Sequence, residues 1–427
     1  MTPPCDAVAA SCRLLLLAVL TSATPATLAE AQAQPASPGE PGSELTVSVI
    51  TLGQGDQVWE RYGHNALWIH DAARGTDRTY NWGVFDASDP RFIVRFVRGR
   101  MRYWLEVVDV QRLMEFYRSS DRSITIQRLA LSPAQRIAIR DFVEWNAREE
   151  NKYYWYDYFR DNCSTRLRDA VDRALGGGLR RATESEVTRN TYRSESIRLM
   201  EGMPLTQAGI AIGLGPVADR KLTGWEEMFV PMRMRDRLRE VRIAGPDGRP
   251  TPLVAEERQA YVARRASELQ QAPPLLKRYA AVGVIAAVVI VGFGLLALVA
   301  WSAPFAIVTA SWSLLSGIGG ILLLFLWLGT HHLFAYRNEN LFHSSPFAVV
   351  LAVLAPLAVY RPRVRASAWR LAAAVVGLSL LGFVLKALPG FDQDNLFVIA
   401  LVLPGHLAVA WALMRLARAA DRRATVS

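Results

Sequence analysis

The sequence has 427 residues, of which 51% are hydrophobic and 21% are charged. This composition excludes a disordered or fibrous chain, and at roughly 150 residues per domain the length allows two or three folded units. The formal net charge is +10, but the basic residues are interspersed with Asp and Glu, which argues against nucleic acid as a partner. Charged residues recur between about Ser43 and Gln271, whereas long uncharged stretches fill Tyr279 to Leu416. The sequence therefore predicts a globular part followed by a membrane part.

The N-terminus has the layout of a secretory signal peptide. Arg13 precedes an apolar run over residues 14–20, which is too short to span a bilayer, and small-residue cleavage sites follow it. We expect a signal peptide over residues 1–33 and a flexible tether over residues 34–43. Removal of the signal leaves Cys163 as the only cysteine, and it has no partner for an intramolecular disulfide.

Residues 44–271 are predicted to form one exported domain of mixed α/β structure. Alternating apolar residues predict strands over residues 44–52, 65–69, 79–84 and 123–131, with the second and third joined as a hairpin. A capping box at Ser132 predicts a helix that reaches Glu150, and a second helix is expected from Cys163 to Ala174. Beyond these we expect a loop and a helix over residues 204–241, a turn over 245–251 and a helical stalk over 255–271.

Residues 279–416 are predicted to hold five transmembrane helices. The apolar stretches cover residues 279–301, 305–328, 346–360, 369–388 and 396–416, of which the third is the shortest. Arginines cluster after the third and the fifth stretch, at Arg361, Arg363, Arg365 and Arg370 and at Arg415, Arg418, Arg422 and Arg423. Both clusters are expected in the cytoplasm, together with the tail over residues 417–427. Lys277 and Arg278, on the outer side of the first stretch, are the exception to this charge pattern.

This topology places two polar stretches on the outer face of the membrane, at residues 330–343 and 392–395. Three histidines occur in the first stretch, but their spacing does not match a metal site, so a solvated loop is the simpler interpretation. Alternatively, polar groups at this depth hold lipid headgroups.

Two residues of the exported domain suggest nucleophilic catalysis. Cys163 is predicted at the first turn of a helix, where unpaired backbone N–H groups and the helix dipole favour a thiolate. His64 follows Gly63 at the start of a strand, which leaves one side of its imidazole open to a neighbouring helix. This pairing is typical of thiol acyl-transfer enzymes. The alternative is that Cys163 is a small buried hydrophobe and His64 an ordinary structural residue.

Several motifs resemble the Lnb family of bacterial lipoprotein N-acyltransferases. They lie at residues 62–67, 80–83, 156–166, 330–332 and 338–340, and the most specific are Gly63-His64 and Asn162-Cys163-Ser164-Thr165-Arg166. The exported domain is also similar to α+β permuted papain-like thiol enzymes of the lecithin:retinol acyltransferase (LRAT-like) and NlpC/P60 kind, in which the histidine precedes the cysteine. That order holds in this chain.

The resemblance implies a bacterial inner-membrane enzyme with its N-terminal domain in the periplasm. Cys163 would be the nucleophile and His64 its base, and Asn81 would orient His64, with Tyr80 as the alternative. Arg61, Asn65 and Asp161 are supporting candidates. Substrate contacts are expected from six further residues, Tyr62, Asn162, Arg166, His331, Asn338 and Asn340. The acyl donor would be a membrane phospholipid and the acceptor the N-terminal amine of a diacylated lipoprotein, with no cofactor and no metal.

Two other function classes fit parts of this pattern. A cell-wall peptidase of the NlpC/P60 kind would use the same order of His and Cys, but it would not need five spans with outer polar loops. A non-enzymatic membrane sensor or scaffold would leave Cys163 buried, and it would give no reason for the Asn-Cys-Ser-Thr-Arg motif. The acyltransferase interpretation accounts for more of the sequence than either.

Overall fold

The computed structural model describes residues 39–244, 248–297 and 302–424. All of them belong to the second of two compact units, which covers Ala36–Ser427. The predicted signal peptide over residues 1–33 and the first part of the tether lie outside the described residues.

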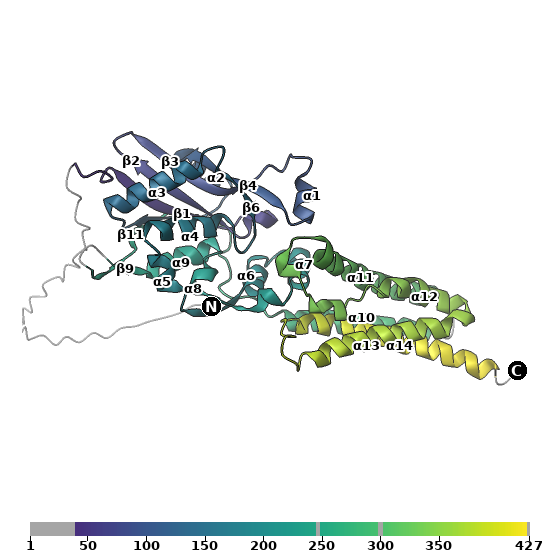
Figure 1. Ribbon diagram of the computed structural model, residues 1–427. Helices are drawn as coiled ribbons and strands as arrows, with labels where there is room; N and C mark the ends of the chain where they lie inside the picture. Colours follow the sequence, from purple (N-terminus) through teal and green to yellow (C-terminus); the bar gives the residue numbers. More distant parts are fainter. Residues whose placement is uncertain (1–38, 245–247, 298–301, 425–427) are drawn as a thin grey trace, which may run out of the picture. The chain divides into compact units, whose positions relative to one another are not determined.

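A seven-stranded antiparallel sheet forms the centre of the N-terminal part (Figure 1). Its strand order is β11-β5-β1-β2-β3-β4-β6. The bounds are Leu45–Leu52 for β1, His64–Asp71 for β2, Thr76–Val84 for β3, Met101–Asp109 for β4, Ile124–Leu129 for β5, Tyr153–Tyr156 for β6 and Val254–Tyr261 for β11. The four strands predicted from alternation are confirmed as β1, β2, β3 and β5, and β2 pairs with β3 as the expected hairpin. The prediction missed β4 and β6.

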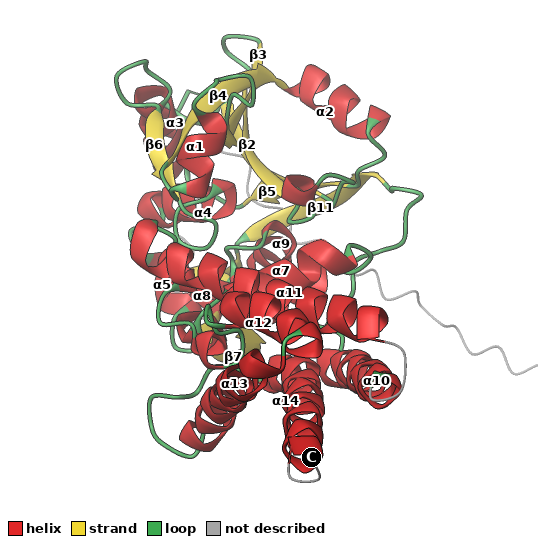
Figure 2. Cartoon of the chain, turned by 90° about the vertical axis from the view of Figure 1, so that its right-hand side faces the viewer, coloured by secondary structure: helices red, strands yellow, loops and turns green. Residues whose placement is uncertain are grey.

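Alternate residues of the central strand β1 pack into two different cores. Leu45, Val47 and Val49 belong to a core on one face of the sheet, whereas Ile50 and Leu52 belong to a core on the other face. Helices α3 (Pro133–Asn146) and α4 (Cys163–Ala174) cover the first face, and α2 (Val110–Ser119) covers the second (Figure 2). Because both faces are covered, β1 is buried along nearly its whole length.

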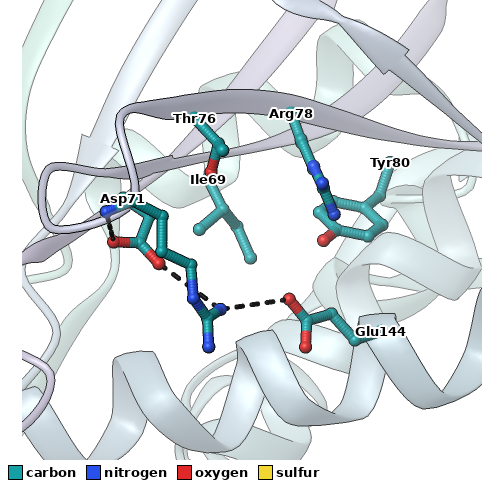
Figure 3. Close-up of a pocket in the computed structure, with 7 residues that line it drawn as sticks. Ile69, Asp71, Thr76, Arg78, Tyr80 and Glu144 are labelled. Carbon is teal, nitrogen blue, oxygen red and sulfur yellow. Dashed lines mark hydrogen bonds and ion pairs between the residues drawn. The ribbon is translucent and has the colours of Figure 1, made fainter.

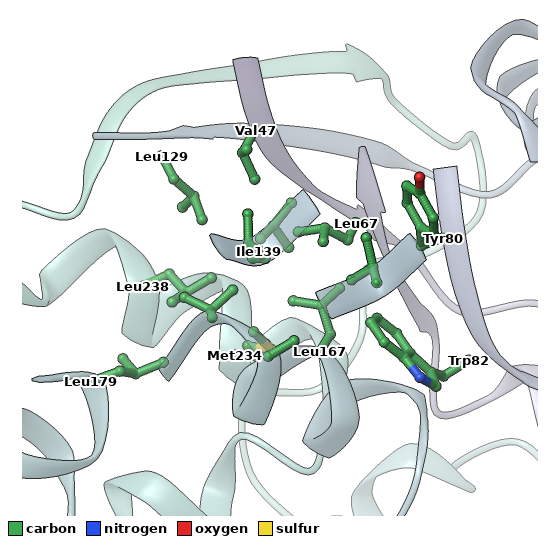
Figure 4. Packing of buried hydrophobic residues seen from close by; sticks show 14 of the residues in the cluster. Val47, Leu67, Tyr80, Trp82, Leu129, Ile139, Leu167, Leu179, Met234 and Leu238 are labelled. Carbon is green, nitrogen blue, oxygen red and sulfur yellow. The ribbon is translucent and has the colours of Figure 1, made fainter. Parts of the chain in front are cut away.

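The larger core joins the sheet to α3 and α4 (Figure 4). Leu67 and Trp82 from the sheet pack with Ile139 of α3 and Leu167 of α4 in this core, and each is almost completely buried. Burying side chains of this size stabilises a fold by about 1.5–3 kcal/mol each. This packing holds α4 against strands β2 and β3.

Both of the helix starts predicted in this region are confirmed. Ser132 Oγ accepts the N–H of Gln135 at 3.3 Å, the Gln135 side chain accepts the N–H of Ser132 at 2.9 Å, and Pro133 is the first helical residue of α3. Helix α4 begins at Cys163, as expected, with Asn162 as its N-cap.

The chain after α4 forms short helices and two small sheets beneath the main sheet. The helices are α5 (Gly178–Thr183), α6 (Tyr192–Leu199), α7 (Pro204–Gly213), α8 (Gly224–Glu227) and α9 (Pro231–Glu240). The two-stranded sheets pair β7 (Val187–Thr191) with β8 (Lys221–Thr223) and β9 (Arg242–Ala244) with β10 (Pro250–Pro252). Part of the turn predicted over residues 245–251 lies outside the described residues.

The prediction of a helical stalk over residues 255–271 is wrong. Strand β11 occupies Val254–Tyr261 and pairs with β5 at the edge of the main sheet. Most of its side chains are exposed, so no apolar alternation marks it as a strand, and its Ala, Glu, Gln and Arg residues have high helix propensity. Cross-strand contacts stabilise it instead, such as the bond from Gln127 Nε2 to Glu257 Oε2 at 2.8 Å.

The C-terminal part is helical. Its main helices are α10 (Leu275–Leu296), α11 (Ser302–Gly329), α12 (Ala348–Tyr360), α13 (Arg365–Leu385) and α14 (Leu396–Ala424). Among the described residues, four helices are long and apolar enough to cross a membrane, namely α10, α11, α13 and α14. Helix α12 has 13 residues and spans about 20 Å, less than the ~30 Å of a bilayer core. The count of five spans therefore stays a prediction.

Candidate functional site

His64 is placed by a glycine turn at the start of β2. Gly63 has a φ of 78°, and a Cβ atom there would lie 2.5 Å from the sulfur of Met232 and 2.8 Å from the carbonyl oxygen of Leu52. Only glycine fits this position without a shift of its neighbours. The turn starts β2 at His64, whose side chain is half-buried.

Asn81 on the neighbouring strand β3 faces the imidazole of His64. The Asn81 Oδ1 atom lies 3.3 Å from His64 Nε2, and Asn81 Nδ2 donates to the carbonyl oxygen and the hydroxyl of Thr79, each at 3.1 Å. Because Nδ2 is used as a donor to Thr79, the oxygen of Asn81 accepts from His64, and Nε2 carries the proton. The other ring nitrogen, Nδ1, is then free to accept a proton.

Tyr80, the alternative to Asn81, points to the other face of the sheet and is buried in the core with Trp82 and Leu67 (Figure 4). Burial raises the pKa of its hydroxyl. Tyr80 also lines a pocket of about 240 Å³ near the β2–β3 hairpin, where Arg74 pairs with Asp71 at 3.5 Å and with Glu144 at 3.8 Å (Figure 3). Of the two candidates, only Asn81 has a hydrogen bond with His64.

Cys163 lies at the first turn of α4, against β3. Asn162 Oδ1 accepts the N–H groups of Ser164 and Thr165, both at 2.9 Å, and this capping fixes where the helix begins. A Cβ atom at Gly83 would lie 3.4 Å from the Cβ of Cys163, so Gly83 contributes only backbone beside the cysteine. The thiol is free and half-buried.

Burial raises the pKa of the Cys163 thiol, and three backbone N–H groups oppose this effect. They belong to Asn65, Ser164 and Cys163 itself, and Arg122 also lowers the pKa from a greater distance. The N–H of Asn65 is next in the chain to His64. The sulfur of Cys163 is thus linked both to the start of α4 and to the start of β2.

Two residues that the sequence analysis missed complete the surroundings of His64. The ring of Tyr117 stacks on the imidazole with a centroid distance of 6.3 Å and an interplanar angle of 4°. The guanidinium of Arg122 lies 4.5 Å from the centre of the Tyr117 ring, donates to the carbonyl oxygen of Gly53 at 2.8 Å and pairs with Glu60 at 3.4 Å. No local motif marks either residue, because each reaches the site from a different element.

These surroundings favour the neutral imidazole. The pKa of His64 is lowered to about 4, first by burial and then by the positive charge of Arg122, while the hydrogen bond with Asn81 acts in the opposite direction. At neutral pH the site therefore holds a neutral imidazole and, since the pKa of Cys163 is raised, a protonated thiol. A neutral imidazole with a free Nδ1 is the kind of base that removes a thiol proton during nucleophilic attack.

The residues expected to contact substrate around Cys163 are held in other bonds. Asn162 is buried and, besides capping α4, donates through Nδ2 to the carbonyls of Tyr158 and Phe229. Arg166 forms a two-point ion pair with Asp161 at 2.6 and 2.8 Å. The geometry gives these side chains a structural role.

The two other predicted residues near the start of β2 also have partners. Burial raises the pKa of Tyr62 to about 12, and a hydrogen bond with Ser196 partly offsets that effect. The guanidinium of Arg61 donates to the carbonyl of Glu201. Among the described residues, neither side chain has a hydrogen bond with His64 or Asn81.

The outer-loop asparagines do not present free amides to a lipid. Asn338 and Asn340 are 2% and 0% exposed. Asn338 Nδ2 donates to the carbonyls of Ile212, Gly213 and Leu214, and Asn340 Nδ2 donates to that of Ile212. These carbonyls end helix α7, so the asparagines cap that helix.

Of the three outer-loop residues predicted to contact substrate, only His331 is exposed. Its backbone N–H donates to the carbonyl of Arg98 at 2.9 Å. The neighbouring His332 bonds the hydroxyl of Tyr158 through Nδ1 at 2.7 Å. Among the residues that the structure describes, no group of three His, Cys, Asp or Glu side chains has the arrangement that a metal ion requires.

His64, Asn81 and Cys163 all lie in a part of the chain that matches a known protein family. A family model described as the Lnb N-terminal periplasmic domain matches residues 41–198. This part of the chain, called the Lnb domain below, is similar to the Lnb N-terminal periplasmic domain. The predicted resemblance to the Lnb family is thereby confirmed, and the Lnb domain is followed by helices that are able to span a membrane. Searches of curated proteins and of solved structures gave no match.

Proposed function

We propose that this chain is a membrane-bound N-acyltransferase that moves a fatty acyl chain from a phospholipid to the N-terminal amine of a lipoprotein. The observation that carries the proposal is the bond between Asn81 and His64, which leaves Nδ1 free as a base, together with the placement of Cys163 at the start of a capped helix. Similarity to the Lnb N-terminal periplasmic domain supplies the class of reaction. No cofactor takes part in the proposed chemistry.

The first half of the proposed reaction acylates the enzyme. His64 Nδ1 takes the proton of the Cys163 thiol while the sulfur attacks the ester carbonyl of a phospholipid. A tetrahedral intermediate forms, the C–O ester bond breaks, and His64 returns the proton to the leaving oxygen of the lysophospholipid. The acyl chain remains on Cys163 as a thioester. The backbone N–H groups of Cys163 and Asn65 are the candidate donors to the oxyanion, since both already interact with the sulfur.

The second half transfers the acyl chain. The N-terminal amine of a diacylated lipoprotein attacks the thioester carbonyl and gives a proton to His64. The C–S bond then breaks, the amide is released, and the proton returns to the thiol. Because both substrates are anchored in the membrane, anchoring the enzyme as well raises the local concentration of each at the site.

The proposal includes a permuted papain-like fold for the Lnb domain. It is supported by the order of the residues, with His64 on a strand that precedes Cys163 at the start of a helix, and by the packing of that helix on an antiparallel sheet. We also propose that α12 completes five spans and that the C-terminus is cytoplasmic. The arginines between α12 and α13 and at the end of α14 support this orientation.

Reconstitution of the purified full-length protein tests the function. Vesicles would contain a phospholipid with acyl chains of known mass and a diacylated lipopeptide, and mass spectrometry would detect the gain of one acyl chain on the peptide amine. Without the lipopeptide, the peptide that contains Cys163 should gain the mass of one acyl chain as a thioester. Cys163→Ala and His64→Ala should abolish both products. Transfer at the wild-type rate by Cys163→Ala would refute the mechanism, and cleavage of peptidoglycan fragments without acyl transfer would support a peptidase.

A further inference from the structure

The short helix α1 (Phe92–Val97) exposes most of its apolar side chains. Ile93, Val94, Phe96 and Val97 are 65%, 52%, 43% and 42% exposed, respectively. Side chains of this kind are costly to leave in water when they lie together, and such a patch usually marks an interaction surface. These exposed side chains take no part in the proposed chemistry, and they do not belong to the hydrophobic core of the N-terminal part.

The end of α1 is bonded to residues that directly follow a membrane helix. The carbonyl of Phe96 accepts from His332 Nε2 at 3.0 Å, and the carbonyl of Arg98 accepts from the N–H of His331 at 2.9 Å. Helix α11, one of the candidate spans, ends at Gly329, only two residues before His331. These bonds place α1 at the level where α11 leaves the bilayer, whichever side of the membrane that is.

The close approach of the two segments is built into the sequence. Gly99 has a φ of 68°, and a Cβ atom there would lie 2.9 Å from the backbone of both His331 and His332. The ring of His332 also stacks on Tyr158, with a centroid distance of 5.8 Å, and accepts the hydroxyl hydrogen of Tyr158 at Nδ1. The position of α1 beside the end of α11 is therefore held by several contacts.

The charges around α1 fit a surface of anionic phospholipid. Arg91, Arg98 and Arg100 are exposed. Arg91 lies near Asp89 at 3.6 Å, whereas in the described part of the chain the guanidinium groups of Arg98 and Arg100 have no acidic partner. Arginines beside exposed apolar side chains are typical of helices that lie in the membrane interface, where the arginines bind lipid phosphates.

We propose that residues 91–100, the membrane-contact segment, insert the exposed apolar side chains of α1 into the bilayer interface and bind anionic phospholipid through Arg98 and Arg100. A second protein or a second copy of the chain would also cover an apolar patch. The bilayer is the occupant that the bonds to the end of α11 and the unpaired arginines favour.

The segment and Cys163 also border the same hydrophobic core, because Phe92, Phe85 and Cys163 all pack against it. Phe92 stacks on Phe85 with a centroid distance of 5.2 Å, and Phe85 follows two residues after Gly83, which packs against Cys163. A lipid whose acyl chain left the bilayer beside α1 would pass these rings on the way to the thiol. This last step rests on the proposed function, whereas the membrane contact does not.

Fluorescence of the full-length protein in vesicles tests the contact. In a Cys163→Ala background, Val94→Cys and Val97→Cys would each carry an environment-sensitive fluorophore, and Val107→Cys on β4 would be the matched control, because Val107 is 39% exposed. In vesicles of phosphatidylglycerol and phosphatidylcholine, we expect a blue shift at positions 94 and 97 and loss of most of the emission when spin-labelled lipid is added. Position 107 should show neither change.

Three outcomes would overturn the proposal. The first is emission at positions 94 and 97 that spin-labelled lipid does not quench, and the second is equal quenching at all three positions. The third is a blue shift that depends on protein concentration and occurs without quenching by lipid, which would indicate that a second copy of the chain covers the patch. Arg98→Gln with Arg100→Gln should reduce the quenching in vesicles with phosphatidylglycerol, and an unchanged value would refute the role of the arginines. Quenching in a protein whose wild type transfers no acyl chain would refute the proposed function and leave the membrane contact intact.

Discussion

Arg122 determines much of the electrostatic character of the site, although it contacts neither reacting group directly. Its buried guanidinium interacts with the face of Tyr117, which in turn stacks on His64. A fixed positive charge there disfavours the imidazolium and favours the thiolate. Both effects are useful to an enzyme in which a neutral base must take the proton of a thiol.

The pH dependence of acyl transfer should reveal this effect. Because the pKa of His64 is lowered to about 4, the wild-type kcat/KM should decline on the acid side only near that pH, well below the ordinary range of histidine. Arg122→Met removes the charge, so the pKa of His64 should rise and the acid limb should move to higher pH. Arg122→Lys keeps the charge and serves as the control. Acid limbs at the same pH in wild type and Arg122→Met would contradict the argument.

The same shift affects stability with a defined sign. Between pH 6.5, where an ordinary histidine titrates, and about 4, the unfolded chain binds a proton at His64 that the folded protein does not bind. The contribution of His64 to stability is therefore complete above about pH 6.5 and is lost as the pH falls towards 4. His64→Gln should flatten the dependence of Tm on pH in this window, as measured by thermal unfolding between pH 4 and 7. An unchanged slope would show that His64 is protonated normally.

Asn81 is expected to act by orienting His64. Asn81→Ala should lower kcat by about 100-fold, the cost of a small misplacement of a catalytic group, with little change in KM. Asn81→Asp keeps an acceptor oxygen and adds a negative charge, so it should retain more activity while raising the pKa of His64 and shifting the acid limb upward. Thermal unfolding of both variants controls for damage to β3. Wild-type kcat in Asn81→Ala would show that the 3.3 Å bond has no catalytic role.

At the scale of elements, the outer loops act as connectors. Asn338 donates to three carbonyls at the end of α7, accepts the N–H of Asn340 at 3.0 Å and accepts from Gln393 at 3.2 Å. Glu339 in the same loop pairs with Lys386 at 2.9 Å. Lys386 and Gln393 lie between α13 and α14, so these bonds tie the loop before α12 both to α7 and to the loop before α14.

Asn338→Ala should therefore destabilise the protein. Leaving buried carbonyls without a donor costs about 1–3 kcal/mol, so Tm in detergent should fall, while labelling of Cys163 by a thiol reagent should stay unchanged at temperatures where the protein is folded. Asp392→Ala, at an exposed position of the second loop, is the control and should keep the wild-type Tm. Lower acyl transfer with an unchanged Tm would instead support lipid binding by Asn338.

Local sequence signals predicted the elements that depend on local physics. The capping box at Ser132 predicted the start of α3, the start of α4 at Cys163 was also expected, and alternation predicted β1, β2, β3 and β5. Strand β11 was mistaken for a helix because its stability comes from pairing with β5 and its side chains are mostly exposed. His64, Cys163 and Asn81 were proposed from the sequence, and their catalytic roles stay predictions. Tyr117 and Arg122 were missed because only the tertiary fold brings them to the surroundings of His64.

At the scale of the whole molecule, one contact bears on the orientation of the membrane helices. Lys277 and Arg278 lie at the start of α10, on the side predicted to be outer, where the rule for cytoplasmic arginines does not expect them. Arg278 is 3.4 Å from Glu201 of the segment before α7, so part of this charge is paired within the chain. Arg363 and Arg370, in contrast, are exposed at the other end of the helices. The charge pattern is therefore consistent with an outer Lnb domain.

Accessibility labelling tests this orientation. With all native cysteines replaced, Asp392→Cys and Arg363→Cys provide two exposed positions, one in each set of loops. In cells whose outer envelope has been opened, a membrane-impermeant maleimide should label position 392 and should reach position 363 only after detergent is added. Both positions should react in detergent, which controls for burial. Labelling of position 363 alone before detergent is added would reverse the orientation. It would place in the cytoplasm the N-terminal part of the chain, whose Asp219 accepts the N–H of Asp394 in the loop of Asp392.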